Sequence, residues 1–528
     1  MSKTGILILT NPARVGKLLP VIKNHVLKTL YIQYYPDKTS LSSNLSVTSL
    51  KWQKPHQSNF ISSIYAMATS MATTIDVRVL ITNIKNSLIN TKKPIELVIF
   101  DKNYSKDEAN SFIKNYLNNS TKNCQYIAIV DTDDEETNNI PEKSTNELDK
   151  NADKIYENVV LGGTFDRLHN GHKILLTEAI IRCKNKLTIG VTDESMIRSK
   201  ILWELIEPVE NRIDNVKNFI QDIDSTLTYE IVAISDVYGP TKIDPNMNMI
   251  VVSEETEKGA IKINELRKNN NLNVLDVCTV KLANDEHHDD HEEAKISSSN
   301  QRIRLLGSRL KEPDLHDKSL KPYIVGLTGG IASGKSSVAT KLQSLGAGVV
   351  HCDKLAHDLY EPGKKCFNII IDIFGSKILT KDGKIDRKIL GNIVFNDKEQ
   401  LDKLNNIVWP AILELAIEEI KNLHDKGCDI IVMEAAVLIQ AKWQFACHEI
   451  WTCIVPHNEA VKRLIERNCL TNDEAESRIS VQPSNVQQVN EATVVFSTIW
   501  SHDVTLEQVT KAWNDLNNFI NEKKINCN

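Results

Sequence analysis

The sequence lacks the features that mark secreted, membrane-spanning and nucleic-acid-binding proteins. Its ten cysteines are scattered over 528 residues without a Cys-x-x-Cys pair, which argues against a disulfide framework or a zinc site and favours a reducing compartment. No uninterrupted apolar run approaches the ~18 residues needed to span a bilayer. The net charge is −6, so we do not expect a nucleic acid as the main partner.

A glycine-rich loop follows the short apolar strand candidate 323–325. The pattern Gly-x4-Gly-Lys-Ser predicts a phosphate-binding loop, because its glycines let backbone N–H groups close around phosphate oxygens of ATP or GTP. Lys335 is expected to reach the β- and γ-phosphates, and Ser336 to help to hold Mg²⁺. The predicted loop residues are Gly329, Gly330, Ile331, Ala332, Ser333, Gly334, Lys335, Ser336 and Ser337.

A second motif lies upstream, where an apolar run leads into Gly-Gly-Thr-Phe-Asp at 162–166 and then His-Asn-Gly-His at 169–172. Two imidazoles three residues apart at a helix start share one face. They can donate to a polyphosphate whose charge grows during attack at the α-phosphorus, and the helix amides add a field of the same sign. A surface turn with solvated histidines is the alternative. The residues expected to be catalytic or to contact ATP are His169, His172, Gly163, Thr164 and Phe165.

Together, in this order, the two motifs resemble the bifunctional coenzyme A synthase family. In that family, a phosphopantetheine adenylyltransferase of the HxGH nucleotidyltransferase superfamily is fused to a dephospho-coenzyme A kinase. The resemblance implies that ATP adenylylates 4′-phosphopantetheine to dephospho-coenzyme A and pyrophosphate. A second ATP, with Mg²⁺, would then phosphorylate the ribose 3′-hydroxyl and give coenzyme A and ADP. The resemblance is close over residues 155–520 and loose before them.

More residues of the transferase half match the family pattern. The segment 295–302 is similar to the signature Ile-Ser-Ser-x-x-x-Arg, which implies that Ser298, Ser299 and Arg302 engage the ATP phosphates. Lys200 and Arg212 fit the basic positions for the phosphorylated substrate. Lone basic residues on a helical stretch form a solvated face equally well, so both interpretations stay open for these two.

The kinase half also matches beyond the phosphate loop. Asp353 takes the second acidic place of the family's Asp-x-Asp element, which implies a base for the 3′-hydroxyl. A helix N-cap is the alternative for this residue. Segments 382–387 and 463–482 resemble the substrate loop and the lid, where arginines meet phosphate oxygens in pairs. The arginines concerned are Arg387, Arg463, Arg467 and Arg478.

Three positions depart from the kinase pattern. His351 stands at the first acidic place of Asp-x-Asp, Trp409 replaces the histidine of a His-Pro pair, and Gln440 replaces a glutamate. With these changes, a weakened kinase is an alternative that stays open. Cys352, beside the expected base, is the cysteine that merits a reactivity test.

The fold expected is α/β, with a Rossmann-like HxGH nucleotidyltransferase domain and a P-loop kinase domain with a parallel sheet, preceded by an additional α/β domain. At ~150 residues per domain, the length suits about three domains. Composition shifts place the boundaries at 1–130 (amino-terminal domain), 131–152 (acidic and polar linker), 153–310 (adenylyltransferase), 311–321 (linker) and 322–528 (kinase).

The amino-terminal domain shows no chemistry of its own. We expect a degenerate nucleotidyltransferase-like domain or a docking module for a protein partner. The first 35 residues are basic without an acidic residue, which suits either an organelle-targeting signal or a buried first strand. The family resemblance implies cytoplasmic and mitochondrial localisation. Strands are expected at 5–10, 30–34, 77–81, 96–100 and 126–130.

Two polar or periodic segments complete the predictions. The run 284–293 carries three histidines among acidic residues, and a solvated loop is favoured there over a metal site. Near the carboxyl end, apolar residues at helical spacing predict a packing face. They are Leu506, Val509, Trp513, Leu516 and Ile520.

Two functional alternatives remain at this point. The transferase half could act on another phosphorylated acceptor and the kinase half on a nucleoside. The chain could instead be a scaffold that keeps an active adenylyltransferase while its kinase site has decayed, which His351 and Gln440 would explain.

Overall fold

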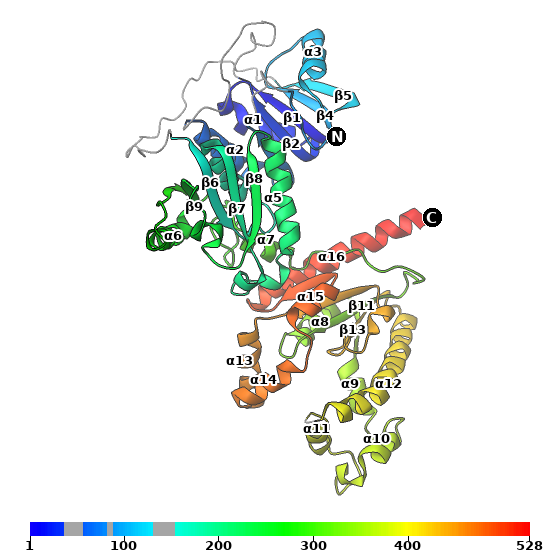
Figure 1. Cartoon of the computed structure of the whole chain (residues 1–528). Helices are drawn as coiled ribbons and strands as arrows, with labels where there is room; N and C mark the ends of the chain where they lie inside the picture. The colour runs from blue at the N-terminus through cyan, green and yellow to red at the C-terminus, as the bar shows by residue number, and fades with distance from the viewer. Residues whose placement is uncertain (36–55, 82–87, 130–153, 396, 528) are drawn as a thin grey trace. The chain divides into compact units, whose positions relative to one another are not determined.

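The computed structural model in Figure 1 describes residues 1–35, 56–81, 88–129, 154–395 and 397–527. It divides into two compact units, Met1–Gln301 and Arg302–Asn528. The predicted linker 131–152 lies outside the described residues. Within the described part, no helix has both the length and the apolar character that crossing a membrane requires.

The amino-terminal part of the first unit is a five-stranded parallel sheet of order β3-β2-β1-β4-β5. All five predicted strands are present, and β1 lies in the middle of the sheet, so the expected additional α/β domain is confirmed. Its elements are β1 (Ser2–Leu9), α1 (Val15–Ile22), β2 (Val26–Tyr34), α2 (His56–Met71), β3 (Asp76–Leu80), β4 (Ile95–Phe100), α3 (Lys106–Tyr116) and β5 (Ser120–Ala128).

The second sheet of this unit is also parallel, with the order β10-β9-β6-β7-β8. Numbered within its own domain, each of the two sheets has the order 3-2-1-4-5, so the topology is the same. The elements here are β6 (Tyr156–Gly163), α4 (Asn170–Arg182), β7 (Cys183–Thr192), α5 (Val209–Ile223), β8 (Thr228–Ile234), β9 (Met249–Ser253), α6 (Glu257–Asn269), β10 (Asp276–Val280) and the start of α7 (Ser298–Leu305).

The second unit is built on the parallel sheet β12-β13-β11-β14-β15. Its strands are β11 (Tyr323–Gly329), β12 (Gly348–His351), β13 (Ile430–Glu434), β14 (Glu449–Ile454) and β15 (Val494–Ser497). The helices are α8 (Lys335–Ser344), α9 (Cys352–Asp358), α10 (Phe367–Phe374), α11 (Arg387–Phe395), α12 (Lys398–Asp425), α13 (His457–Asn468), α14 (Asn472–Ser480), α15 (Asn485–Glu491) and α16 (His502–Cys527). In such open sheets, ligands bind at the carboxyl ends of the strands.

Helix α16 packs on the second unit through most of the predicted face. Val509, Leu516 and Ile520 are buried, and Trp513 packs partly buried against the same core. The prediction is wrong for Leu506, which is 41% exposed. The inward position at this end of the helix is taken by Gln508, whose amide bonds with the backbone of β15 on both its oxygen and its nitrogen.

Candidate active sites

The two predicted catalytic histidines meet at the start of α4. His169 is the N-cap residue of this helix and His172 lies in its first turn. Their rings stack with centroids 3.8 Å apart and an interplanar angle of 20°. Gly171 permits this approach, because a Cβ there would lie 3.2 Å from the His169 ring. The arrangement presents two imidazoles beside the unpaired amides of a helix amino terminus.

The end of β6, the loop 164–168 after it and the start of α7 surround this pair. The ring of Phe165 is fully buried, and its centroid lies 5.2 Å from that of His172. The Ser298 hydroxyl donates to the Asp166 carbonyl oxygen at 3.0 Å and lies 3.4 Å from Nε2 of His169. The Thr192 hydroxyl donates to that of Thr164 at 3.2 Å. The predicted loop residues and Ser298 therefore gather at one place.

Helix α7 places the remaining predicted residues of the segment 295–302. Ser299 comes next to Ser298, and Arg302 lies one helical turn further along the helix. The boundary between the two units falls directly before Arg302. The role of Ser299 and Arg302 toward ATP therefore stays a prediction.

The electrostatics of this site keep His172 neutral. Burial, together with the positive charge of Lys200, lowers the pKa of His172 to about 3. Burial and the charge of Lys200 also lower the pKa of Lys295. Lys200 is thus close enough to act on both groups, and its exposed ammonium adds positive charge where a polyphosphate would bind.

Arg212 is a buried residue that holds the loop before α4. Its side chain is among the largest that are fully buried, so the solvated-face alternative is wrong. It donates to the carbonyl oxygens of Glu207 and Thr164, each at 2.7 Å. The guanidinium therefore holds the loop that carries Thr164, and contact with the substrate stays a prediction.

The phosphate loop of the second unit has the backbone that its glycines predict. Gly329 and Gly334 have φ values of 147° and 85°, which favour glycine. A Cβ would lie 2.4 Å from the Cys453 carbonyl oxygen at Gly329, and 2.8 Å from the Thr498 methyl carbon at Gly334. Lys335 begins α8, and its ammonium donates to the carbonyl oxygens of Gly329 and Gly330 at 3.0 and 3.3 Å.

Glu434, at the carboxyl end of β13, is a site residue that the sequence motifs do not include. The Ser336 hydroxyl donates to its carboxylate at 2.7 Å, and His351 bonds to the other oxygen of the same carboxylate. His351 and Glu434 are also register partners in the β12–β13 ladder. The signal was present in the sequence as an acidic residue directly after the apolar run 430–433. Hydroxyl and carboxylate oxygens are the ligands that Mg²⁺ prefers, so this pair fits the ion.

Asp353 lies in the first turn of α9 and is exposed. The N-cap residue of α9 is His351, so the alternative of a helix cap for Asp353 is wrong. Its neighbour Cys352 is buried, and burial raises the pKa of this thiol to about 12. A thiol of that kind does not act as a nucleophile near neutral pH, which removes the reason for singling out Cys352.

The four predicted arginines lie in different environments: Arg463 contacts the phosphate loop, and the other three are exposed. Arg463 on α13 donates to the Ala332 carbonyl oxygen at 3.2 Å and the Thr498 carbonyl oxygen at 2.7 Å, which ties α13 to the phosphate loop. Arg467 lies on the same helix and faces solvent, close enough for its charge to act on Lys335. Arg387 and Arg478 are exposed, at the start of α11 and on α14.

Two neighbouring glutamines have structural contacts near the lid. Gln482 accepts a hydrogen bond from the backbone N–H of Ile331 at 2.7 Å, so it steadies the phosphate loop. Gln440 donates to the Val481 carbonyl oxygen at 3.1 Å. Trp409 is partly buried on α12 against the core of this unit. None of these contacts disrupts the phosphate loop.

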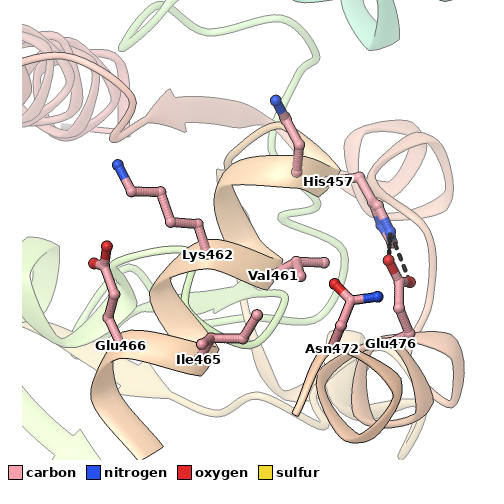
Figure 2. Close-up of a pocket in the computed structure, with 8 residues that line it drawn as sticks. His457, Val461, Lys462, Ile465, Glu466, Asn472 and Glu476 are labelled. Carbon is pink, nitrogen blue, oxygen red and sulfur yellow. Dashed lines mark hydrogen bonds and ion pairs between the residues drawn. The ribbon is translucent and has the colours of Figure 1, made fainter. Parts of the chain in front are cut away.

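A pocket of about 450 Å³ lies between α13 and α14 (Figure 2). His457 and Glu476 pair across it at 2.9 Å. On α13, its lining residues occupy the face opposite Arg463 and Arg467, and no predicted site residue lines it. It is lined by His457, Asn458, Val461, Lys462, Ile465, Glu466, Asn472 and Glu476. This pocket is therefore separate from the phosphate-binding face.

The histidine-rich run 284–293 forms no metal site within the described residues, where no group of three or more histidine, cysteine or acidic side chains is placed to hold an ion. His287 and His288 each bond to a backbone carbonyl oxygen. Both are exposed, in agreement with a solvated loop.

Comparison with known proteins finds a family model for each of two segments of the chain, and named relatives for the second. A family model described as dephospho-CoA kinase matches residues 323–499, and one described as cytidylyltransferase-like matches residues 160–304. A dephospho-CoA kinase of Carboxydothermus hydrogenoformans is 44% identical over 186 residues, which are 35% of this chain and 90% of the relative. One of Moorella thermoacetica is 36% identical, over 37% of this chain and 92% of the relative. A solved dephospho-CoA kinase from Campylobacter jejuni is 26% identical, with a TM-score of 0.29, and covers 37% of this chain and 96% of that one.

Proposed function

This chain belongs to the dephospho-CoA kinase family and carries a cytidylyltransferase-like domain before its kinase domain, and we propose that it is a bifunctional coenzyme A synthase. The first reaction joins the adenylyl group of ATP to 4′-phosphopantetheine, which yields dephospho-coenzyme A and pyrophosphate. The second moves the γ-phosphoryl group of another ATP to the ribose 3′-hydroxyl, which yields coenzyme A and ADP.

The observation that carries the first step is the stacked pair of His169 and His172 at the amino terminus of α4. The phosphate of 4′-phosphopantetheine attacks the α-phosphorus, the bond to the bridging oxygen breaks, and pyrophosphate leaves. His172, held neutral, donates an N–H to the oxygens that gain charge, and His169 acts beside it. Lys200 offsets the charge of the triphosphate. No proton transfer is required of either imidazole.

The second step uses the phosphate loop. Lys335 meets the β- and γ-phosphates, while the backbone N–H groups of 329–337 surround the phosphate oxygens. Ser336 and Glu434 would hold Mg²⁺, which supplies neutralisation of phosphate charge when bound. Asp353, exposed at the start of α9, accepts the proton of the 3′-hydroxyl. The arginines Arg387, Arg467 and Arg478 are the proposed contacts for the phosphates of the substrate.

A scaffold with an active adenylyltransferase and a decayed kinase site is the second candidate, and His351 is the observation that favours it. The geometry of Glu434 argues against this candidate. The carboxylate that is missing at residue 351 is replaced by one from the adjacent strand, in contact with both His351 and Ser336. A carboxylate therefore remains where a divalent cation would need it.

The test is incubation of the purified protein with 4′-phosphopantetheine, ATP and Mg²⁺, with the products followed by mass. The parent should make coenzyme A, and His172→Ala should make neither product. Lys335→Ala should accumulate dephospho-coenzyme A, because it keeps the transferase site intact. A parent that stops at dephospho-coenzyme A would support the scaffold candidate. A parent that makes neither product would contradict the assignment of the substrates.

A further inference from the structure

The amino-terminal domain repeats the topology of the transferase domain without its chemistry. Both sheets have the order 3-2-1-4-5, but the loop after β1 carries no histidine. In the place where the transferase domain opens its loop, the buried carboxylate of Asp101 accepts hydrogen bonds from the backbone N–H groups of Thr10 and Asn11 and from the Thr10 hydroxyl. The protein's own carboxylate thus occupies the donors that an anion would use.

This domain is joined to the transferase domain by a continuous buried core. One hydrophobic cluster includes residues of β1–β4 and of β6, α4 and α5. Helix α2 packs against α4, and α5 packs against β3. The backbone N–H of Ile81, just after β3, donates to the carbonyl oxygen of Ile223 at 2.9 Å. The two domains therefore share one interior within the first unit.

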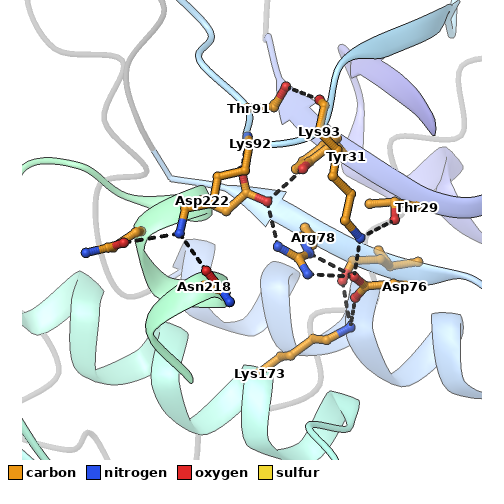
Figure 3. Close-up of polar contacts among 12 residues, drawn as sticks. Thr29, Tyr31, Asp76, Arg78, Thr91, Lys92, Lys93, Lys173, Asn218 and Asp222 are labelled. Carbon is orange, nitrogen blue, oxygen red and sulfur yellow. Dashed lines mark hydrogen bonds and ion pairs between the residues drawn. The ribbon is translucent and has the colours of Figure 1, made fainter. Parts of the chain in front are cut away.

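Buried charges at this junction find their partners across it, as Figure 3 shows. Asp222, at the end of α5, accepts from the Tyr31 hydroxyl, the Arg78 guanidinium and the backbone N–H of Lys92, at 2.6–2.7 Å. All three donors belong to the amino-terminal domain. A carboxylate with no exposed side-chain surface is costly to leave unpaired, so the junction is specific rather than a loose contact.

Two of the cross-domain contacts reach the catalytic motif itself. Asn170, between the two histidines, donates through its amide to the Tyr65 carbonyl oxygen at 3.2 Å and the Thr69 hydroxyl at 2.9 Å, both on α2. Lys173, directly after His172, donates to the Asp76 carboxylate at 2.8 Å and the Val77 carbonyl oxygen at 2.9 Å. The amino-terminal domain thus holds the first turn of α4 from both sides of His172.

We propose that the amino-terminal domain is a positioning domain for the transferase site, acting through Asn170 and Lys173 as positioning residues. The first turn of a helix is where its backbone frays most readily, since four N–H groups have no intrahelical partner. The imidazoles of His169 and His172 are attached to that turn. Anchoring it fixes the donors where charge develops in the transition state, and small displacements of such groups slow catalysis strongly. This inference rests on the proposed transferase activity.

The experiment compares double variants of the full chain. Thr69→Val with Asp76→Asn weakens both anchors from the amino-terminal side, because it removes the Thr69 hydroxyl and the Asp76 charge, and it leaves every transferase residue unchanged. The contacts of Asn170 and Lys173 with the Tyr65 and Val77 carbonyl oxygens remain. Thr91→Val with Asp101→Asn is the matched control. It removes a buried hydroxyl and a buried carboxylate charge whose partners lie inside the amino-terminal domain. Thr69→Ser with Asp76→Glu keeps both functional groups and tests rescue.

We expect the transferase kcat of the anchor variant to fall on the order of 10-fold or more. Its KM for ATP should change much less, because the histidines act in the transition state. The kinase kcat of the same chain should stay as in the parent, the matched control should change neither rate, and the rescue variant should recover much of the loss. An unchanged transferase kcat, or an equal loss in the matched control, would overturn the proposal.

Amide hydrogen exchange of the peptide that contains residues 169–173 supplies a readout that does not need activity. Faster exchange there in the anchor variant than in the matched control supports positioning, and equal exchange contradicts it. If the parent itself makes no dephospho-coenzyme A, the proposed function fails. The exchange measurement then still decides whether the amino-terminal domain holds the start of α4.

Discussion

At the scale of single residues, the protonation state of His172 distinguishes this site from a simple cluster of cations. Positive charge comes from Lys200, while burial and that same charge keep the imidazole neutral. A neutral imidazole donates one hydrogen bond without a full charge, so in the proposed transferase reaction it would stabilise the transition state without binding the ground-state triphosphate too tightly.

The low pKa of His172 predicts how this residue responds to pH. The His172 resonance, assigned by its loss in His172→Gln and observed with label at histidine Cε1, should not titrate between about pH 5 and 8. The unfolded chain has an ordinary histidine pKa near 6.5, so it binds more protons than the native state below that value. The contribution of His172 to stability is therefore present above about pH 6.5 and lost as pH falls toward 3. A titration midpoint between about pH 6 and 7 in the native protein would contradict the burial.

At the scale of the element, the phosphate loop depends on its contact with the segment after β15. Thr498 lies against Gly334 on one side and accepts a hydrogen bond from Arg463 on the other. The loop is therefore in contact with the segment after β15 and with α13, and its shape depends on contacts from a different part of the chain.

Gly334→Ala tests the contact between the phosphate loop and Thr498. The added Cβ would meet the Thr498 methyl carbon at 2.8 Å at a φ of 85°, so we expect the kinase kcat/KM to fall on the order of 10²-fold with the transferase rate unchanged. Gly427→Ala is the matched control, because φ is 100° there but a Cβ would meet nothing within 4 Å. Equal losses in steady-state assays of both variants would show that strain alone, and not the contact with Thr498, is responsible.

Elements and local motifs followed from the sequence because their signals are local. Strand periodicity predicted the five strands of the amino-terminal sheet, and glycine and histidine spacing located the phosphate loop and the paired histidines. The burial of Arg212 was not predictable in this way, because it depends on Thr164, far along the chain. Glu434 had a local signal, an acidic residue directly after an apolar run, but its contact with Ser336 had none. Leu506 was mistaken because helical spacing does not reveal that Gln508 takes the inward position.

At the scale of the molecule, the first unit is held together by a charged network inside an apolar junction. Burial alone would raise the pKa of Asp76, but the positive charges of Lys173 and Arg78 lower it to about 2. Since this pKa lies below the ordinary 3.8, the stabilisation is complete above about pH 4 and lost as pH falls toward 2. The junction should therefore persist through the whole physiological range.

Asp76→Asn measures this contribution. At pH 7 the variant should lose on the order of 2 kcal/mol of unfolding free energy in the first unit, observed as faster amide exchange of β3 and α4. The difference from the parent should shrink as the pH falls from about 4 to 2, because the parent then loses the same charge. A difference that stays constant with pH would mean that packing, rather than the charge of Asp76, sets the loss.

The shared interior of the first unit has a consequence for folding during synthesis. The ribosome releases residues 1–129 before the transferase segment, and domains generally fold in that order at about 5–20 residues per second. The surface formed by α2 and β3 therefore exists when α4 leaves the exit tunnel. The nascent helix α4 can then assemble on a surface that is already formed, so that Lys173 passes from water to its buried partners before Asp222 follows with α5.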